Sequence, residues 1–449
     1  MGLGSWASRF IKKDLIQNFI YLQLLIALIG GFSGVVLFFA FAIVDNYEAF
    51  LYLEIILIGA MIGMEIPLVV RILKSYLPLS KNISNVFTAD YIGALFASLL
   101  FPLVLLPKLG LLQSSLFLGA MNVFVALLAW IVFRDNLKRE VLFFIVLLFL
   151  ALGVGFLALG RFSAFVEHKL YYDPIIYSKH TPYQKIVITR KKDRVRLYIN
   201  GALQFDSLDE YRYHELLVHP AFISAKKRDR VLILGGGDGL ALREILKYPD
   251  VKRVTLVDLD GAITDIFKSN RLLRRLNRDS LNSKRVEVLN MDAWKYIENS
   301  KELFDVIVVD LPDPNNISLS RLYSRKFYTM LKNHLSKTGA LVVQSTSPLF
   351  ARKAFWSIEK TIASTSLKTT PYHIYVPSFG EWGFVLATHQ KMKFDFNKLP
   401  KDLKFLTPKV LKMALFFPKD MQKLNVKINT IFTHPLLKYY EKGWDYWYE

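Results

Sequence analysis

The 449-residue chain contains no cysteine, which excludes disulfide bonds and thiolate zinc sites. Its 8 histidines are not spaced as metal ligands, so the sequence indicates no metal. Acidic residues are scarce: 38 Asp and Glu stand against 58 Lys and Arg, which gives a formal net charge of +20. No motif that reads nucleic acid accompanies this charge, so we expect no nucleic-acid partner. The first residues also lack the charged segment, short apolar core and small-residue cleavage site of a secretory signal.

Apolar residues are abundant, at 53% of the chain, and the mean hydropathy is +0.28. Five apolar stretches in the first third are each about long enough to cross a bilayer, for which roughly 20 residues are needed. They lie at residues 16–44, 49–73, 86–106, 111–133 and 141–160. Buried core helices rarely run so long without charge. We therefore predict an N-terminal α-helical transmembrane bundle over residues 1–165, with the lipid bilayer as its partner.

Residues 231–260 have the pattern of a nucleotide-binding βαβ unit. A buried strand, Val231 to Leu234, breaks into Gly235-Gly236-Gly237-Asp238-Gly239, and a second strand, residues 253–257, ends at Asp258. Glycines let the backbone turn tightly against a ligand, and a carboxylate after the next strand can bind two ribose hydroxyls. The spacing G-x-G-x-G suits a nucleoside without a pyrophosphate, such as S-adenosylmethionine. Taken alone, the loop is also compatible with a plain strand-to-helix turn.

Acidic residues follow four predicted strands of this region. Strands at residues 286–290 and 304–309 lead into Asp292-Ala293 and Asp310-Leu-Pro-Asp313-Pro314. In an open parallel sheet, ligands bind beyond the carboxyl ends of the strands. The acids that fall there are Asp238, Asp258, Asp292, Asp310 and Asp313. Acids gathered at one crevice in a basic chain predict a cationic substrate.

These motifs resemble the polyamine aminopropyltransferases, the spermidine synthase family. The resemblance extends from about Leu170 to Thr388, and the hydrophobic first third resembles the membrane-embedded, multi-pass branch of that family. It implies a Rossmann-like α/β nucleoside-binding domain over residues 226–449, preceded by a small β-hairpin domain over residues 166–225. The implied reaction transfers the aminopropyl group of decarboxylated S-adenosylmethionine, a co-substrate rather than a cofactor, to a diamine such as putrescine. The products would be spermidine and 5′-methylthioadenosine.

The resemblance also assigns residues to the donor. Gln184, in Thr181-Pro-Tyr-Gln-Lys185, matches a glutamine that contacts the sulfonium nucleoside. Asp238 would bind the aminopropyl ammonium and Asp258 the ribose. Asp292, followed by Ala293, would hold the adenine amino group.

On the amine side, the resemblance makes Asp310 the general base, with Asp313 helping to hold the amine. Tyr213 and His214 match an acidic-aromatic helix start and would approach the amine and aminopropyl groups. A capped amphipathic helix with core aromatics is the alternative interpretation of that segment. Phe379 stands where soluble family members usually place a tyrosine, and Glu381 adds a carboxylate expected nearby. The sequence therefore predicts aminopropyl transfer more firmly than it predicts which amine accepts the group.

Two other functions remain open. The same fold serves S-adenosylmethionine-dependent methyltransferases, but Asp238 would then face the methionine carboxylate at low dielectric. A non-catalytic membrane polyamine sensor or transporter is the second alternative, against which an intact Asp310 base argues. The sequence leaves homo-oligomerisation open, and the tail from Lys391 shows no readable chemistry.

Charge asymmetry predicts the orientation of the bundle. Basic residues precede the first apolar stretch and follow the second and fourth, which the positive-inside rule places in the cytoplasm. Five crossings would then place the C-terminal domain outside, away from cytosolic nucleosides. We expect that domain on the cytoplasmic face of the cell membrane, because its nucleoside substrate is supplied from the cytosol. The number of predicted crossings argues for the opposite side. Glu65 and Asp90 lie near Arg71 at one membrane edge, where ion pairing is the simplest interpretation.

Overall fold

A computed structural model describes residues 1–44, 46–76, 78–171, 173–391 and 393–448. The chain divides into two compact units, Met1–Pro174 and Ile175–Glu449. Apolar clusters of the first unit draw on its helices alone, and the larger clusters of the second draw on its strands and helices. Each unit is therefore described by itself.

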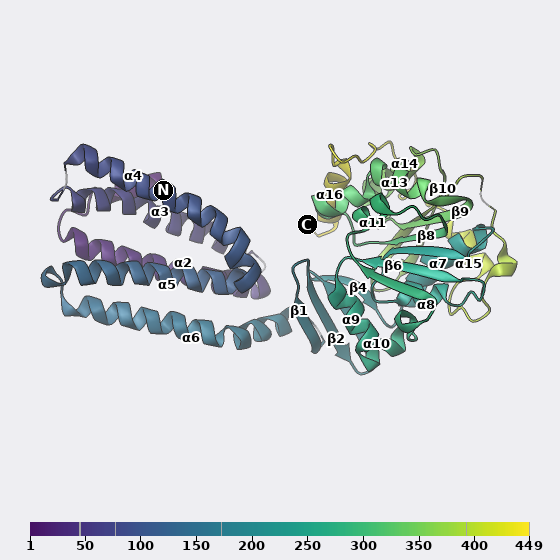
Figure 1. Ribbon diagram of the computed structural model, residues 1–449, viewed down its shortest axis with the longest axis horizontal. Helices are drawn as coiled ribbons and strands as arrows, with labels where there is room; N and C mark the ends of the chain where they lie inside the picture. The colour runs from purple at the N-terminus through teal and green to yellow at the C-terminus, as the bar shows by residue number, and fades with distance from the viewer. Residues whose placement is uncertain (45, 77, 172, 392, 449) are drawn as a thin grey trace. The chain divides into compact units, whose positions relative to one another are not determined.

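The first unit is entirely helical in the part that the structure describes (Figure 1). Its elements are α1 (Gly2–Ser8), α2 (Leu15–Ile43), α3 (Glu48–Leu73), α4 (Leu79–Leu100), a π-helical turn (Phe101–Leu105), α5 (Leu106–Phe133), a 3₁₀ turn (Arg134–Asn136) and α6 (Arg139–Leu170). Helix α2 packs against α3, α5 and α6. The helical region continues past residue 165, where the sequence analysis placed its end.

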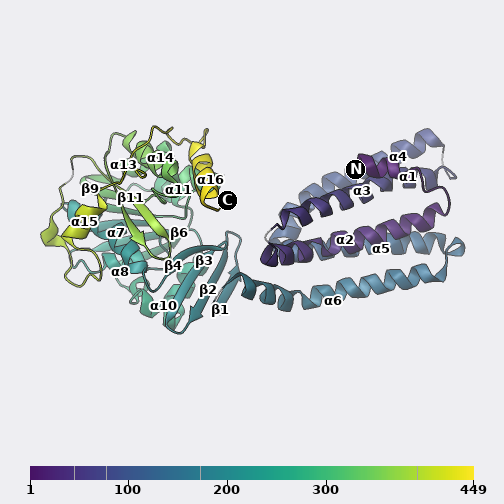
Figure 2. The same cartoon turned by 180° about the vertical axis from the view of Figure 1, so that it is seen from behind.

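Four helical segments are long and apolar enough to cross a membrane, as judged by length and composition over the described residues: Leu15–Phe41, Glu48–Leu73, Leu79–Phe133 and Arg139–Gly160. The third has 55 residues, which is about 80 Å of helix and far exceeds a bilayer core of about 30 Å. Gly110 breaks it with a φ of +74°, a left-handed conformation that glycine adopts without strain. After the turn between them, α5 runs in the opposite direction to α4, so the two apolar stretches predicted here correspond to two helices (Figures 1 and 2).

The outward faces of these helices expose large apolar side chains. Leu157 is 85% exposed, Val132 70% and Leu103 69%. The acidic residue Glu65 accepts a hydrogen bond from Gln23 Nε2 at 2.5 Å. Arg71 donates to the Ser8 carbonyl oxygen at 2.8 Å. The ion pair that the sequence analysis expected between Glu65 and Arg71 is therefore replaced by hydrogen bonds to other groups.

The second unit begins with a small antiparallel sheet. Its strands, in spatial order, are β1 (Ile175–His180), β2 (Lys185–Lys191), β3 (Arg194–Ile199) and β4 (Ala202–Asp206). The predicted hairpin corresponds to β2 and β3. Asp206 at the end of β4 accepts hydrogen bonds from Arg194 and Arg196, which ties the sheet edge together.

A larger sheet of seven strands follows, in the order β10-β11-β9-β8-β5-β6-β7. Strands β5 to β9 pair in parallel, and β10 and β11 are antiparallel at one edge. Their bounds are β5 (Arg230–Gly235), β6 (Arg253–Asp258), β7 (Val286–Asn290), β8 (Phe304–Asp310), β9 (Leu335–Gln344), β10 (Lys368–Val376) and β11 (Gly380–Thr388). The strands predicted from the sequence are confirmed, and the Rossmann-like α/β class with them.

Helices cover both faces of this sheet (Figure 2). One face packs with the small sheet and with α7 (Glu210–Ser224), α8 (Leu240–Ile245), α9 (Gly261–Ser269), α10 (Arg271–Leu276) and α15 (Pro408–Ala414). The other packs with α11 (Ala293–Asn299), α13 (Arg325–Asn333), α14 (Arg352–Ala363) and α16 (Pro435–Tyr448), beside the short α12 (Ile317–Ser320). Alternation along β5 divides the faces, since Val231 and Ile233 face the first core and Leu232 and Leu234 the second. Helices α15 and α16 pack on opposite faces of the sheet, so the C-terminal segment contributes to both cores.

Candidate functional site

The loop between β5 and α8 approaches β8 closely. Gly235 has a φ of +83°, and a Cβ there would lie 2.1 Å from the Asp310 carbonyl oxygen. Gly236, at φ +64°, lies so near the Asp310 side chain that a Cβ would be 3.2 Å from Oδ2. Only glycine fits both the conformation and the space at Gly235. The loop therefore sets the Asp310 carboxylate directly beside the backbone at the end of β5.

The same loop binds the carboxylate at the end of β6. Gly237 N donates to Asp258 Oδ2 at 3.0 Å, and Asp260 N donates to Oδ1 at 3.0 Å. A Cβ at Gly237 would lie 2.6 Å from Asp258 Oδ2. Gly239, at φ +77°, completes the turn into α8. The glycine positions predicted as a ligand loop thus hold two acidic residues in place.

Asp238 lies within the loop and accepts a hydrogen bond from Leu240 N at 2.9 Å. Burial raises the pKa of Asp238 to about 6, and the charge of His214 opposes that shift only in part. Burial likewise raises the pKa of Asp258 to about 6 against its two backbone hydrogen bonds. Both carboxylates are therefore costly to ionise without a cation beside them.

Asp310 accepts a hydrogen bond from the Tyr213 hydroxyl at 2.6 Å. Burial raises the pKa of Asp310, while His214 and the Tyr213 hydrogen bond lower it to a smaller extent. Burial, followed by the charge of Asp310, raises the pKa of Tyr213 well above its ordinary value. Tyr213 therefore stays a proton donor to Asp310, a contact that the sequence analysis did not predict, and its hydroxyl has a partner beyond the packing of its ring.

His214 is held in place by Glu210, which is itself paired with Arg243. Its Nδ1 lies 2.8 Å from Glu210 Oε2, and Arg243 binds the two oxygens of Glu210 through Nη1 and Nη2, both at 2.9 Å. Although burial raises the pKa of Glu210, His214 and Arg243 lower it to about 2. Burial lowers the pKa of His214, but Glu210 outweighs that and raises it overall. This arrangement orients the imidazole toward the charges of Asp238 and Asp310.

Asp313 is bound by three neutral donors. Gln344 Nε2 lies 3.2 Å from Oδ1, Thr346 Oγ1 lies 3.0 Å from Oδ2, and the Tyr440 hydroxyl also donates to the carboxylate. Burial raises its pKa to about 6, since these hydrogen bonds lower it less. Sequence reasoning missed all three donors, because they come from β9, the turn after it and the C-terminal helix, far from Asp313 in the chain.

Asp292 has a different environment from the one expected. Its Oδ1 caps α11 by accepting from Trp294 N at 2.7 Å, and Arg321 pairs with Oδ2. The guanidinium of Arg321 also lies 5.8 Å from the centre of the Trp294 ring. Asp292 is therefore a helix cap already paired with a cation, beside the buried Ala293. No residue close to Asp292 in the sequence indicates that Arg321 would form an ion pair with it.

Gln184 lies in the turn before β2 and is half-buried. Its carbonyl oxygen closes that turn by accepting from Thr181 N at 2.9 Å. Thr181 Oγ1 in turn donates to Asp260 Oδ2 at 2.7 Å. The small sheet thus brings the Gln184 turn next to Asp260, two residues after Asp258.

The loop that precedes β11 lies beside Tyr213. The ring of Phe379 is 6.1 Å from that of Tyr213 in an edge-to-face arrangement, and Asp209 holds the loop through Ser378 N at 2.7 Å. Glu381, by contrast, pairs with His373 Nδ1 on the opposite face of β11. The expectation of a second carboxylate near the amine at Glu381 is therefore wrong, because Glu381 lies on the face of β11 opposite Trp382, and Trp382 is the side chain that packs with Phe379.

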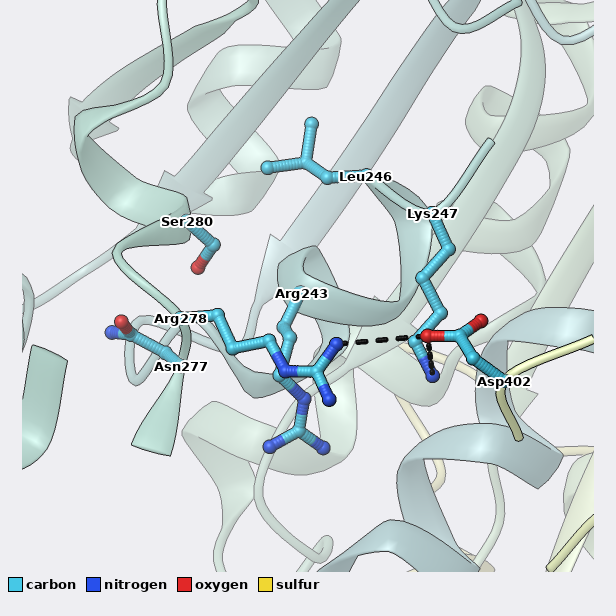
Figure 3. A pocket seen from close by; sticks show the side chains of 7 residues that line it. All are labelled: Arg243, Leu246, Lys247, Asn277, Arg278, Ser280 and Asp402. Carbon is cyan, nitrogen blue, oxygen red and sulfur yellow. Dashed lines mark ion pairs between the residues drawn. The ribbon is translucent and has the colours of Figure 1, made fainter. Parts of the chain in front are cut away.

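Behind the glycine loop lies a separate pocket of about 340 Å³ (Figure 3). Its lining is basic, with Arg243, Lys247 and Arg278 beside Asp402. Lys247 and Arg278 both pair with Asp402 at its rim. From this side Asn277 Nδ2 supports the Asp238 carbonyl oxygen at 2.9 Å. The lining of this pocket, through Asn277, therefore supports the glycine loop on the side away from the acidic side chains.

Fold and site together define a class: a Rossmann-like enzyme domain whose strand ends present carboxylates to a cationic, nucleoside-type ligand. A model of the "Spermine/spermidine synthase domain" matches residues 210–398. The "Polyamine aminopropyltransferase" of Leptospira interrogans serogroup Icterohaemorrhagiae serovar copenhageni is 47% identical, over 99% of this chain and 90% of its own length. That of Oceanobacillus iheyensis is 42% identical, over 99% of this chain and 89% of its own length.

Solved structures agree with these relatives. A crystal structure of "Spermidine Synthase in Complex with Transition State Analogue AdoDATO" matches with a TM-score of 0.52 at 25% identity, covering 55% of this chain and 88% of that one. Spermidine synthase from Thermotoga maritima matches with a TM-score of 0.51 at 25% identity, covering 55% of this chain and 87% of that one. The chain belongs to the polyamine aminopropyltransferase family. The family resemblance and the enzyme class inferred from the sequence are thereby confirmed.

Replacing Arg243 by Met should strongly destabilise the second unit. The substitution leaves Glu210 and Glu244, which Arg243 binds at 2.9 Å each, without that cation in a largely buried position. Breaking such a pair costs about 3–5 kcal/mol of the free energy of unfolding. Chemical denaturation followed by intrinsic fluorescence would measure it.

The matched control is Arg274→Met. Arg274 pairs with Asp279 at 2.8 Å, but the two side chains are 44% and 46% exposed. Its loss should cost less than about 1 kcal/mol. Equal effects of the two substitutions would show that the buried pairs of Arg243 with Glu210 and Glu244 do not stabilise the fold as predicted.

Proposed function

We propose that the protein transfers the aminopropyl group of decarboxylated S-adenosylmethionine to a diamine such as putrescine, with Asp310 as the general base. The observation that carries this proposal is the Asp310 carboxylate, aligned by Tyr213 beside the glycine loop. Spermidine and 5′-methylthioadenosine are the products. No resident cofactor takes part in this reaction.

The donor carries two positively charged groups, a sulfonium and a primary ammonium. Asp238 is assigned to the ammonium and Asp258 to the ribose hydroxyls, with Gln184 contacting the nucleoside from the small sheet. The raised pKa values of Asp238 and Asp258, each about 6, support this assignment. A bound ammonium replaces the water that burial has removed from Asp238 and favours its charged form.

The acceptor amine must lose a proton before it can attack, because an ammonium has no lone pair. Asp310 takes that proton, and its raised pKa makes it a stronger base than an ordinary aspartate. The nitrogen lone pair then forms a bond to the methylene next to sulfur. The carbon–sulfur electron pair returns to sulfur, which leaves as a neutral thioether. Asp313 is assigned to the amine as well, and holding both reactants in line contributes the rest of the rate.

Asp238 also favours aminopropyl transfer over methyl transfer. The methyl donor carries a carboxylate where the decarboxylated donor carries none. A carboxylate facing Asp238 would place two like charges together at low dielectric, which is strongly unfavourable. The neighbouring Asp310 charge, which already raises the pKa of Asp238, would add to the repulsion.

The first unit is proposed to span the cell membrane, with the second unit on the cytoplasmic side. Long apolar helices with exposed apolar faces support the first part, because such surfaces are rare on soluble monomers. The supply of the donor nucleoside from the cytosol supports the second. Lipid is therefore proposed as the partner of the first unit.

Asp310→Asn should lower turnover by about two to four orders of magnitude while donor binding survives. The amide keeps the side chain's size and can still accept from Tyr213, but it removes the base. An acceptor amine with a pKa of about 10 then stays protonated at neutral pH. Turnover with saturating substrates and donor binding by calorimetry are the two measurements. The control is Asp265→Asn on the exposed side of α9, and near-normal turnover of Asp310→Asn would refute the assigned base.

Acidification from pH 7 to pH 5 should lower kcat/KM at least about tenfold, because Asp238 and Asp313, with pKa values of about 6, lose the charges assigned to amine groups, and Asp258, with a pKa of about 6, loses its ionised form as acceptor for the ribose hydroxyls. The sign for stability is opposite. A carboxyl whose pKa is raised by folding takes up protons more readily in the folded state, so the ligand-free protein gains stability as the pH falls through this range. Kinetics and thermal melting should therefore move in opposite directions. Parallel loss of both would indicate acid unfolding instead.

The absence of cysteine allows a direct test of membrane topology. Lys301→Cys, at an exposed position of the second unit, should resist an impermeant maleimide in intact cells and react after lysis. Labelling of Lys301→Cys in intact cells would contradict a cytoplasmic second unit. Lys13→Cys, exposed just before α2, reports the other end of the bundle. Five crossings place Lys13 on the outer side, whereas an even number leaves it protected.

A further inference from the structure

The C-terminal helix α16 contacts the group of acids from outside the residues that match the synthase domain. The Tyr440 hydroxyl donates to the Asp313 carboxylate, beside Gln344 and Thr346. The Tyr440 ring itself packs against the second core of the unit. A residue about 130 positions beyond Asp313 thus belongs to the immediate surroundings of that carboxylate.

A second line of contact joins α16 to the loop that carries Phe379. Trp444 lies 5.2 Å from the ring of Phe350, and Trp447 lies 5.3 Å from it. Phe350 in turn lies against Gly380, where a Cβ would be 2.5 Å from its ring. Gly443 lets the helix backbone reach this point, since a Cβ there would be 2.9 Å from the Phe350 carbonyl oxygen. Helix α16 therefore contacts Asp313 through Tyr440 and reaches the loop of Phe379 through Phe350.

The segment that leads into α16 is anchored and cannot be regarded as a loose tail. The side chain of Asn429 is fully buried and donates to the Ser320 and Tyr323 carbonyl oxygens at 2.8 and 3.2 Å. Asn429 N donates to Thr361 Oγ1 at 3.0 Å. His434, next to the start of α16, lies 3.1 Å from Ser320 Oγ. These contacts fix the position from which Tyr440 reaches Asp313.

The chemistry of the contact suggests its role. A carboxylate that must receive an ammonium needs its oxygens held in one orientation, and hydrogen-bond donors provide this without adding a competing positive charge. Phe379 contributes a ring but no hydroxyl to this end of the site. Tyr440 contributes a hydroxyl from the opposite side of the sheet.

We propose that Tyr440 is a positioning residue for the acceptor, acting through the Asp313 carboxylate, and that α16 bounds the site and limits the length of the amine that it accepts. The inference rests on the proposed function, because it assigns Asp313 to the acceptor. It adds a specificity element from the C-terminal segment, in which the sequence showed no chemistry.

The test uses the full chain and compares Tyr440→Phe with Tyr439→Phe. Both substitutions remove one hydroxyl from the same helix and keep a ring that packs against the same core. Tyr440→Phe should raise the acceptor KM about tenfold, as expected for one hydrogen bond to a charged group. The donor KM and the melting temperature should stay close to those of the parent, and Tyr439→Phe should leave both KM values unchanged.

A second variant tests the limit on amine length. Tyr440→Ala removes the ring as well as the hydroxyl, and should raise kcat/KM for a triamine relative to a diamine about tenfold. Diamines of three, four and five carbons and the triamine spermidine are the probes. A merely structural role would lower kcat/KM for all of them alike.

Two results would overturn the inference: an acceptor KM for Tyr440→Phe within about twofold of the parent, or equal shifts in donor and acceptor KM. Failure of the proposed function would look different. In that case the unmodified protein, given decarboxylated S-adenosylmethionine and putrescine, would form no new polyamine by mass spectrometry. Parental turnover with unresponsive Tyr440 variants would refute the role of α16 alone.

Discussion

The site depends on carboxylates that are largely shielded from water without a paired cation from the described part of the protein. Within the described ranges, Asp238, Asp258, Asp310 and Asp313 form no ion pair with lysine or arginine, and burial raises the pKa of each. Their partners are backbone N–H groups, an amide and hydroxyls. Glu210 is the opposite case, because Arg243 and His214 lower its pKa to about 2. The fold thus separates an acid whose charge is stabilised by direct pairing with cations of the protein from acids that have no such pair among the described residues.

The glycine loop makes this separation geometrically feasible. Close approach of Gly235 to the Asp310 carbonyl oxygen brings the ends of β5 and β8 together, and Gly237 does the same for Asp258. The charge of Asp310 raises the pKa of both Asp238 and Asp258, so bringing these acids to one edge of the sheet has an energetic cost that a cationic ligand offsets. His214 relieves it only in part, since its own charge is paired with Glu210.

Sequence reasoning succeeded where chemistry follows local pattern. Strand ends and the glycine spacing located Asp238, Asp258, Asp310 and Asp313, because in a parallel sheet these positions must share one edge. It failed where a partner arrives from elsewhere in the fold. Arg321 forms an ion pair with Asp292, and His373 pairs with Glu381 on the other face of β11. Tyr440, from the last helix, donates a hydrogen bond to Asp313. Such pairs have no fixed spacing along the chain, so only packing reveals them.

The acidic site and the net charge of +20 do not conflict, because the two act over different distances. Exposed charges interact through water and are screened within about 8 Å at physiological ionic strength. Carboxylates at the strand ends interact with a ligand through protein, where the effective dielectric is lower and screening is weak. A bound polyamine therefore senses chiefly the carboxylates that touch it, and the basic surface of the chain sets how the protein meets larger, anionic surfaces. Recognition of the small cation and the charge of the whole molecule can thus be of opposite sign.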